Sequence, residues 1–128
     1  YNHRMGLYDG VLIKDNHIQA FGGIQKAVDH IRREVSHLVK IEIETTDLEE
    51  VTQALDAGAD VIMLDNMDME AVRTAVKLVD HRALVDVSGR VGKDDLQALA
   101  DAGVDIISVG ALVHGAVFVD ISMRIIAG

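Results

Sequence analysis

The chain has 128 residues, of which 49% are apolar, and its formal net charge at pH 7 is −9. This size suffices for one domain with a packed core, and the acidity argues against broad binding to nucleic acid or anionic membranes, which require a basic face. The sequence contains no cysteine, which excludes disulfides and thiolate metal sites, and no apolar run long enough to span a bilayer.

Five β-rich runs recur along the chain, and several of them are apolar at consecutive positions. Consecutive apolar positions are typical of strands that are buried on both faces of a parallel sheet. The predicted strands are Val11–Lys14, Val39–Glu44, Val61–Leu64, Ala83–Val87 and Asp105–Val109.

Apolar residues at helical spacing fill the segments between these strands. Thr46 and Glu49 have the spacing of a capping box and predict the start of the second helix. Gly58 and Gly103 stand where a glycine commonly follows the end of a helix. The predicted apolar stripes run over Ile24–Val35, Leu48–Leu55, Met69–Val79 and Leu96–Ala100.

Strands that alternate with helices predict an α/β fold with a parallel sheet and right-handed crossovers. Five βα units do not close an eight-stranded barrel, so the chain is either an open sheet or a partial barrel. The chain starts at Tyr1, within what reads as functional sequence, which favours a partial barrel. We therefore expect a fragment of a longer protein.

Polar residues or glycines follow every predicted strand, at the carboxyl ends where parallel α/β folds bind their ligands. Strand ends are also polar by default, so this pattern fits a plain surface as well as a site. The residues concerned are Lys14–His17, Glu42, Glu44, Thr45, Asp65, Asn66, Ser88–Arg90, Gly110, Ala111 and the nearby His114.

Several of these residues have competing interpretations. Lys14 fits an ordinary strand-end lysine, a cation for an anionic substrate, or a Schiff-base nucleophile. Glu44 and Asp65 fit solvated carboxylates or ligands of Mg²⁺, which usually binds one or two carboxylates together with substrate phosphates. The turns Ser88–Arg90 and Val109–Ala111 contain glycine, and their backbone N–H groups suit a phosphate.

Taken together and in order, these motifs resemble the quinolinate phosphoribosyltransferase family. The resemblance rests on "NHRMGLYDGVLIKDNHI" (2–18), "IEIET" (41–45), "AGADVIMLDNM" (57–67), "VSGRV" (87–91) and "AGVDIISVGALVH" (102–114). It implies that residues 1–128 are the C-terminal part of an incomplete α/β-barrel catalytic domain. The family's N-terminal α/β-sandwich domain and first barrel strands would then be absent from this sequence.

The resemblance also implies an activity. The family makes nicotinate mononucleotide, diphosphate and CO₂ from quinolinate and phosphoribosyl diphosphate, uses Mg²⁺, and feeds NAD synthesis. It implies a cytoplasmic enzyme that works as a homodimer or larger homo-oligomer, in which a partner's N-terminal domain covers the barrel site. Two alternatives remain: an inactive barrel fragment of that enzyme, and a phosphate-binding aldolase that uses Lys14.

The family's functional residues fall on matching positions of this chain. The resemblance assigns catalytic roles to Lys14, Glu44 and Asp65, with the two carboxylates near the ribose and the metal. Its remaining substrate-binding residues are His3, Arg4, Ser88, Gly89, Arg90, Val109, Gly110, Ala111 and His114.

The chain departs from the family's usual pattern in both turns. Arg90 stands where the family usually has glycine, so a positive φ at this position would be strained, although an arginine suits phosphate. Val113 and Gly115 replace hydroxyl-bearing residues.

Overall fold

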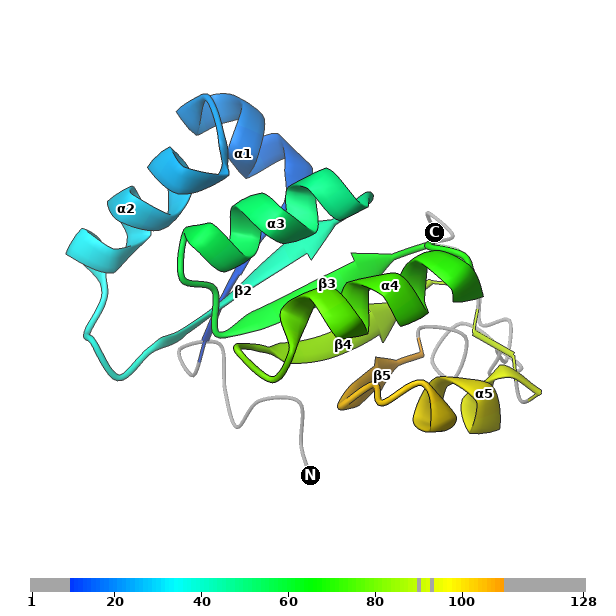
Figure 1. The fold of residues 1–128 in the computed structure, drawn as a ribbon. Coiled ribbons are helices and arrows are strands. Elements are labelled where there is room, and N and C mark those ends of the chain that lie inside the picture. Colours follow the sequence, from blue (N-terminus) through cyan, green and yellow to red (C-terminus); the bar gives the residue numbers. More distant parts are fainter. Residues whose placement is uncertain (1–9, 90, 93, 110–128) are drawn as a thin grey trace, which may run out of the picture.

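The computed structural model describes residues 10–89, 91–92 and 94–109. These residues form a five-stranded parallel sheet in which the strands lie in chain order (Figure 1). Each predicted strand is present, and no end differs from the prediction by more than one residue. The strands are β1 (Gly10–Ile13), β2 (Lys40–Thr45), β3 (Val61–Asp65), β4 (Leu84–Ser88) and β5 (Ile106–Ser108).

Five helices connect or follow these strands within the described residues. The first has no counterpart among the predicted helices, because its seven residues are too few for a clear apolar stripe. Gly22 (φ 76°) and Gly23 (φ 130°) separate it from the second helix. The helices are α1 (Asp15–Phe21), α2 (Ile24–Glu34), α3 (Leu48–Asp56), α4 (Met69–Val79) and α5 (Asp95–Asp101).

The alternation of buried residues in β2 shows that the helices cover one face of the sheet. Ile41, Ile43 and Thr45 are fully buried, whereas the residues between them are exposed or half-buried. The buried set packs into one core cluster with helix residues such as Val28 and Val51. The prediction that strands with consecutive apolar residues are buried on both faces holds for β3, in which Val61–Leu64 are all buried, whereas β2 has alternating apolar residues and an alternating burial pattern.

The consecutive strand order decides between the two architectures that the sequence leaves open. A doubly wound open sheet reverses its strand order and carries helices on both faces. Here the order is consecutive, and the helices lie along one side of a curved sheet (Figure 1). The described residues therefore form a segment of a β/α-barrel wall, as predicted.

The predicted capping box at the start of α3 is wrong by one residue. Asp47 is the N-cap, and its side chain accepts a hydrogen bond from the Glu50 N–H at 2.8 Å. Glu50 reaches back to the N–H of Thr46 at 2.7 Å and to its hydroxyl at 2.9 Å. Asp is at least as good an N-cap as Thr, so the helix starts one position later than predicted.

The amino ends of the strands are joined by two equivalent aspartates. Asp60, just before β3, accepts a hydrogen bond from the Ile41 N–H of β2 at 2.8 Å. Asp105, just before β5, accepts one from the Val85 N–H of β4 at 2.9 Å. Each aspartate lies two residues after a positive-φ glycine, Gly58 or Gly103, as expected for glycines that follow helices.

An arginine completes the first of these contacts. Arg32 in α2 donates to the Asp60 carboxylate at 2.6 Å and to the Val39 carbonyl at 3.0 Å. Burial would raise the pKa of Asp60, but the hydrogen bond from Ile41 and the hydrogen bond and charge of Arg32, with the charge of Lys40, hold it below its usual range. The ionised Asp60 therefore contributes to stability.

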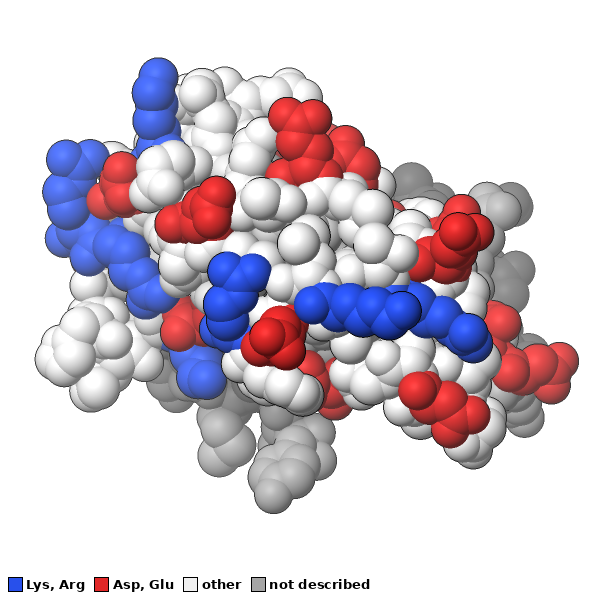
Figure 2. Space-filling model, in the orientation of Figure 1, with Lys and Arg blue, Asp and Glu red and all other residues white. Residues whose placement is uncertain are grey.

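The helix-covered face carries no single-sign charge field. Lysines and arginines are interspersed with aspartates and glutamates across this view (Figure 2). Among the described residues, no helix is long and apolar enough to cross a membrane.

Candidate active site

The carboxyl ends of the strands bring most of the described candidate residues to one edge of the sheet. Lys14 directly follows β1, Glu44 lies near the end of β2, and Asp65 ends β3. Ser88 ends β4 and pairs in register with Asp65. The predicted convergence at this edge is therefore correct for the residues that the structure describes.

Lys14 and Glu44 form an ion pair across the first two strands. Ile13 pairs with Ile43, which places the next residues of the two strands side by side. The Lys14 Nζ lies 3.4 Å from the Glu44 carboxylate, and the side chains are 51% and 16% exposed, respectively. The lysine thus retains solvent-facing donors for an anion.

His17, whose role the sequence leaves open, fixes the backbone at Lys14. The Lys14 N–H donates to the His17 Nδ1 at 3.1 Å. The N–H groups of Asn16 and His17 are satisfied by the side chains of Asp15 at 2.6 Å and Asn16 at 2.8 Å. These residues therefore form the start of α1, and the three-residue spacing from Lys14 to His17 is the signal that could have predicted the contact.

Asn66 joins the end of β3 to the end of β4. Its side-chain amide donates to the Asp65 carboxylate at 2.9 Å, and its backbone N–H donates to the Ser88 carbonyl at 3.1 Å. Its φ of 53° is left-handed, a conformation that asparagine tolerates better than most residues. Sequence reasoning placed Asn66 at a strand end but gave it no function.

Gly89 is required by this junction. Its φ is 119°, and a Cβ at this position would lie 2.5 Å from the Asn66 side-chain oxygen. Only glycine avoids both the strain and the overlap. The prediction of a glycine turn after β4 therefore has a structural basis at Ser88 and Gly89.

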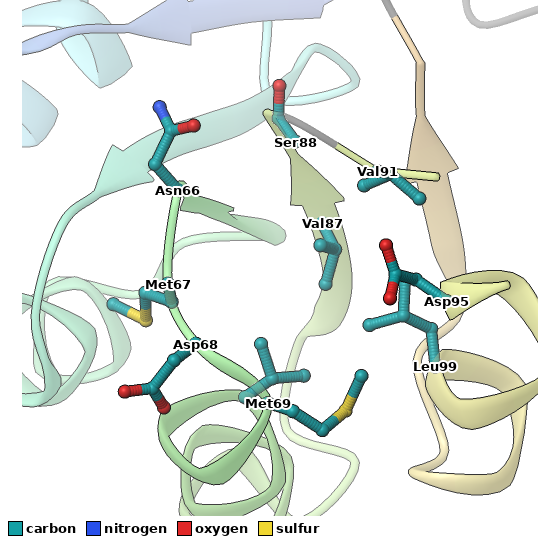
Figure 3. Close-up of a pocket in the computed structure, with 10 residues that line it drawn as sticks. Asn66, Met67, Asp68, Met69, Val87, Ser88, Val91, Asp95 and Leu99 are labelled. Carbon is teal, nitrogen blue, oxygen red and sulfur yellow. The ribbon is translucent and has the colours of Figure 1, made fainter. Parts of the chain in front are cut away.

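A cavity of about 680 Å³ lies between α4 and α5, beside this junction. Figure 3 shows Asn66 and Ser88 at one end of it and Met69 and Leu99 at the other. The two carboxylates on its wall already accept hydrogen bonds, Asp68 from Ala71 and Asp95 from Gly92. These carboxylates disfavour an anion, so the cavity does not suit a phosphate.

The other predicted site residues lie outside the described part of the chain. They are His3, Arg4, Arg90, Gly110, Ala111 and His114. Val109, the first residue of the second turn, is described and follows β5 directly.

Comparison of the chain with known proteins identifies a family that it resembles. Residues 1–124 match the family described as quinolinate phosphoribosyl transferase, C-terminal domain. The probable nicotinate-nucleotide pyrophosphorylase (carboxylating) of Bacillus subtilis is 44% identical over 125 residues, 98% of this chain and 43% of that protein. The protein of the same name in Synechocystis is 44% identical over 128 residues, with the same shares covered.

A solved structure agrees with these sequence relatives. The nicotinate-nucleotide pyrophosphorylase from Francisella tularensis superposes with a TM-score of 0.81 at 44% identity, over 88% of this chain and 40% of that one. The chain thus spans less than half the length of the relatives it matches. The chain belongs to the quinolinate phosphoribosyltransferase family, and the match lies in the family's C-terminal domain.

Proposed function

We propose that this chain forms the barrel part of an active site that converts quinolinate and phosphoribosyl diphosphate into nicotinate mononucleotide, diphosphate and CO₂. The observation that carries the proposal is the convergence of the Lys14–Glu44 ion pair and the Asp65–Asn66–Ser88 junction on one edge of the sheet. Relatives that share 44% identity over 98% of the chain are named for this reaction.

Lys14 is proposed to neutralise part of the quinolinate dianion, together with His3 and Arg4. An arginine binds a carboxylate through two parallel hydrogen bonds, and a lysine supplies a compact charge. The half-exposed Lys14 is held by Glu44 on one side and by its capped backbone on the other. Such a lysine can meet a substrate carboxylate without first being ordered.

Glu44 and Asp65 are proposed to act on the ribose. When the pyridine nitrogen attacks C1 and diphosphate leaves, positive charge develops on the sugar. A carboxylate held near that charge stabilises it, or holds the ribose hydroxyls in place. The Asn66 side-chain amide donates a hydrogen bond to one oxygen of the Asp65 carboxylate at 2.9 Å. This bond fixes the orientation of the carboxylate.

The same two carboxylates are proposed as the protein ligands of Mg²⁺. No group of three or more candidate ligands exists among the described residues, which argues against an all-protein cage. Two carboxylates on neighbouring strands fit Mg²⁺, which usually takes one or two together with substrate phosphates. When bound, the ion would offset negative charge on the leaving diphosphate.

The two turns are proposed to receive the phosphates. Ser88, Gly89 and Arg90 form the first, and the second runs over 109–111 with His114 nearby. Gly89 supplies the positive φ of 119° that this turn adopts, and backbone N–H groups in such turns suit a phosphate. Arg90 would add a charged contact to phosphate where the family usually has glycine.

We also propose the wider context that the resemblance implies. Residues 1–128 would be the C-terminal part of the barrel domain, preceded by the first barrel strands and an N-terminal α/β-sandwich domain. The protein would act in the cytoplasm as a homodimer or larger homo-oligomer, with a partner's domain covering the site. The names of the relatives favour this function over the competing aldolase.

Replacement of Lys14 by alanine tests the proposal. The complete polypeptide that carries these residues is assayed for nicotinate mononucleotide with quinolinate, phosphoribosyl diphosphate and Mg²⁺. Loss of one charged hydrogen bond to substrate predicts a rise in the quinolinate KM of tenfold or more, since such bonds contribute about 1.5–3 kcal/mol. Lys26→Ala, on the exposed side of α2, serves as the matched control.

Three outcomes separate the alternatives. Unchanged kinetics of Lys14→Ala would reject the assigned role. Absence of product with the unmodified complete polypeptide would reject the proposed reaction. A borohydride-trapped adduct of Lys14 with a carbonyl substrate would favour the aldolase instead.

A further inference from the structure

Asp86 is a buried carboxylate that the proposed function does not use. It lies in the middle of β4 and is 0% exposed. Its register neighbours are Met63 in β3 and Ile106 in β5. Since Met63 also pairs with Glu44, Asp86 shares the sheet face of Glu44, opposite the helix-packed core.

Among the described residues, only one of the two carboxylate oxygens of Asp86 accepts a hydrogen bond. The Ser108 hydroxyl donates to the Asp86 Oδ2 at 2.8 Å. Within the described part of the chain, the buried Oδ1 has no hydrogen-bond partner. A buried carboxylate oxygen without a partner destabilises a fold, and an apolar residue of similar size is usually better tolerated. Stability alone therefore does not account for an aspartate here.

Ser108 lies where the proposed phosphate-binding edge begins. It is the last residue of β5, pairs in register with Ser88, and directly precedes Val109. Ser88 in turn is bonded through its carbonyl to Asn66. The Asp86–Ser108 hydrogen bond thus links the end of β5 to a residue of β4 that lies two positions before the end of that strand.

We propose that Asp86 is a positioning residue for the diphosphate portion of the substrate. Through Ser108, it sets the end of β5 against the end of β4, so that Gly89 and Val109, which directly follow the two strands, are held beside each other at the same polyanion. This inference deepens the proposed function and rests on it. Asp86 itself touches no substrate in this role.

The test removes the Ser108 hydroxyl in one variant and retains a hydroxyl in a second. A third variant changes an aspartate that has a structural role only. Ser108→Ala deletes the donor, and Ser108→Thr retains it on a half-buried strand residue. Asp105→Asn is the matched control, because Asp105 precedes the same strand at its opposite end and accepts from the Val85 N–H. All variants are made in the complete polypeptide that carries these residues.

The expected result is a selective change in KM. Ser108→Ala should raise the KM for phosphoribosyl diphosphate about tenfold, as expected for a lost hydrogen bond to a charged group, with the quinolinate KM changed less than about twofold. Ser108→Thr should stay near the unmodified protein. Asp105→Asn should lower Tm without changing either KM. Asp86→Asn combined with Ser108→Ala should add little to Ser108→Ala alone.

Two results would overturn the inference. Ser108→Ala could lower Tm as Asp105→Asn does while leaving the KM for phosphoribosyl diphosphate unchanged, which would make the contact structural only. Ser108→Thr could behave like Ser108→Ala, which would show that the hydroxyl is not the group that matters.

A binding measurement separates this inference from the proposed function. If the unmodified polypeptide makes no nicotinate mononucleotide, the proposed function fails, and the Tm rise caused by inorganic diphosphate then becomes the readout. A rise that is reduced by Ser108→Ala and kept by Ser108→Thr and Asp105→Asn supports the positioning role. The absence of any rise in the unmodified polypeptide rejects it.

Discussion

The two ends of the parallel sheet use polar residues for different purposes. At the amino ends, Asp60 and Asp105 each bind a backbone N–H of the neighbouring strand, and Asp60 also binds Arg32. At the carboxyl ends, Lys14 is half exposed, and Asn66 has a left-handed backbone. Carboxylates bonded to the backbone stabilise a barrel, whereas exposed charge and an unfavourable backbone conformation are typical of a ligand-binding edge.

The largest expected effect comes from Gly89→Ala. This change should disrupt the carboxyl ends of the strands and leave the contacts at their amino ends intact. The added Cβ meets the Asn66 side chain at 2.5 Å, so both the Asp65 carboxylate and the turn after β4 must move. A displacement of this kind should lower kcat/KM about 100-fold. Steady-state kinetics with both substrates measure it.

Gly92→Ala provides the control for this variant. A Cβ on Gly92 meets the Asp95 carboxylate at 3.3 Å, which a small side-chain shift relieves, and its φ lies outside the left-handed region. Near-normal kinetics are expected. Equal damage in both variants would mean that the whole loop, and not the contact with Asn66, is sensitive.

The next effect comes from Asp60→Asn, which would weaken the amino end alone. The amide keeps an acceptor for the Ile41 N–H and removes the charge opposite Arg32. Because this contact is partly exposed, the unfolding free energy at pH 7 should fall by about 1–2 kcal/mol. Both KM values should stay unchanged.

The pH dependence of Asp60→Asn has a defined sign. The folded-state pKa of Asp60 lies below its ordinary value of 3.8. The stabilisation by Asp60 is therefore complete above that pH and is lost as the pH falls through the folded-state pKa. Urea unfolding of both proteins between pH 7 and pH 2.5 should converge at the acid end, and a constant difference would contradict the assignment.

The smallest expected effect comes from His17→Ala. Its contact with the Lys14 backbone contributes to stability and also positions a residue of the candidate active site, so this variant affects both properties. Loss of the acceptor for the Lys14 N–H should lower the unfolding free energy by about 1 kcal/mol. The quinolinate KM should rise a few-fold because Lys14 is less well held. His17→Gln supplies an acceptor suited to this helix position and should restore both values.

The sequence predicts the fold well where apolar runs and glycines act locally. All five strands follow from consecutive or alternating apolar residues, and Gly58 and Gly103 mark helix ends because few other residues adopt a positive φ. The helix α1 was missed because it is short and has no fully buried residue. The start of α3 was misplaced because Thr46 and Asp47 are both good caps.

The site is less predictable because it depends on strand register. That Lys14 meets Glu44, and that Ser108 meets Asp86, follows from how neighbouring strands align, which no local pattern contains. Asp86 nevertheless has a visible signal, a single carboxylate inside an apolar strand. The sequence does not indicate the structural role of Asn66. That role depends on a left-handed backbone conformation, which the neighbouring residues do not predict.

The aspartates at the amino ends also bear on how such a wall is assembled. Each reaches back along the chain, Asp60 from β3 to β2 and Asp105 from β5 to β4. The later of two neighbouring strands in the chain is thus preceded by the aspartate that binds the backbone of the earlier strand. Each of these two units therefore carries, at the edge opposite the candidate active site, a contact that holds it to the strand before it.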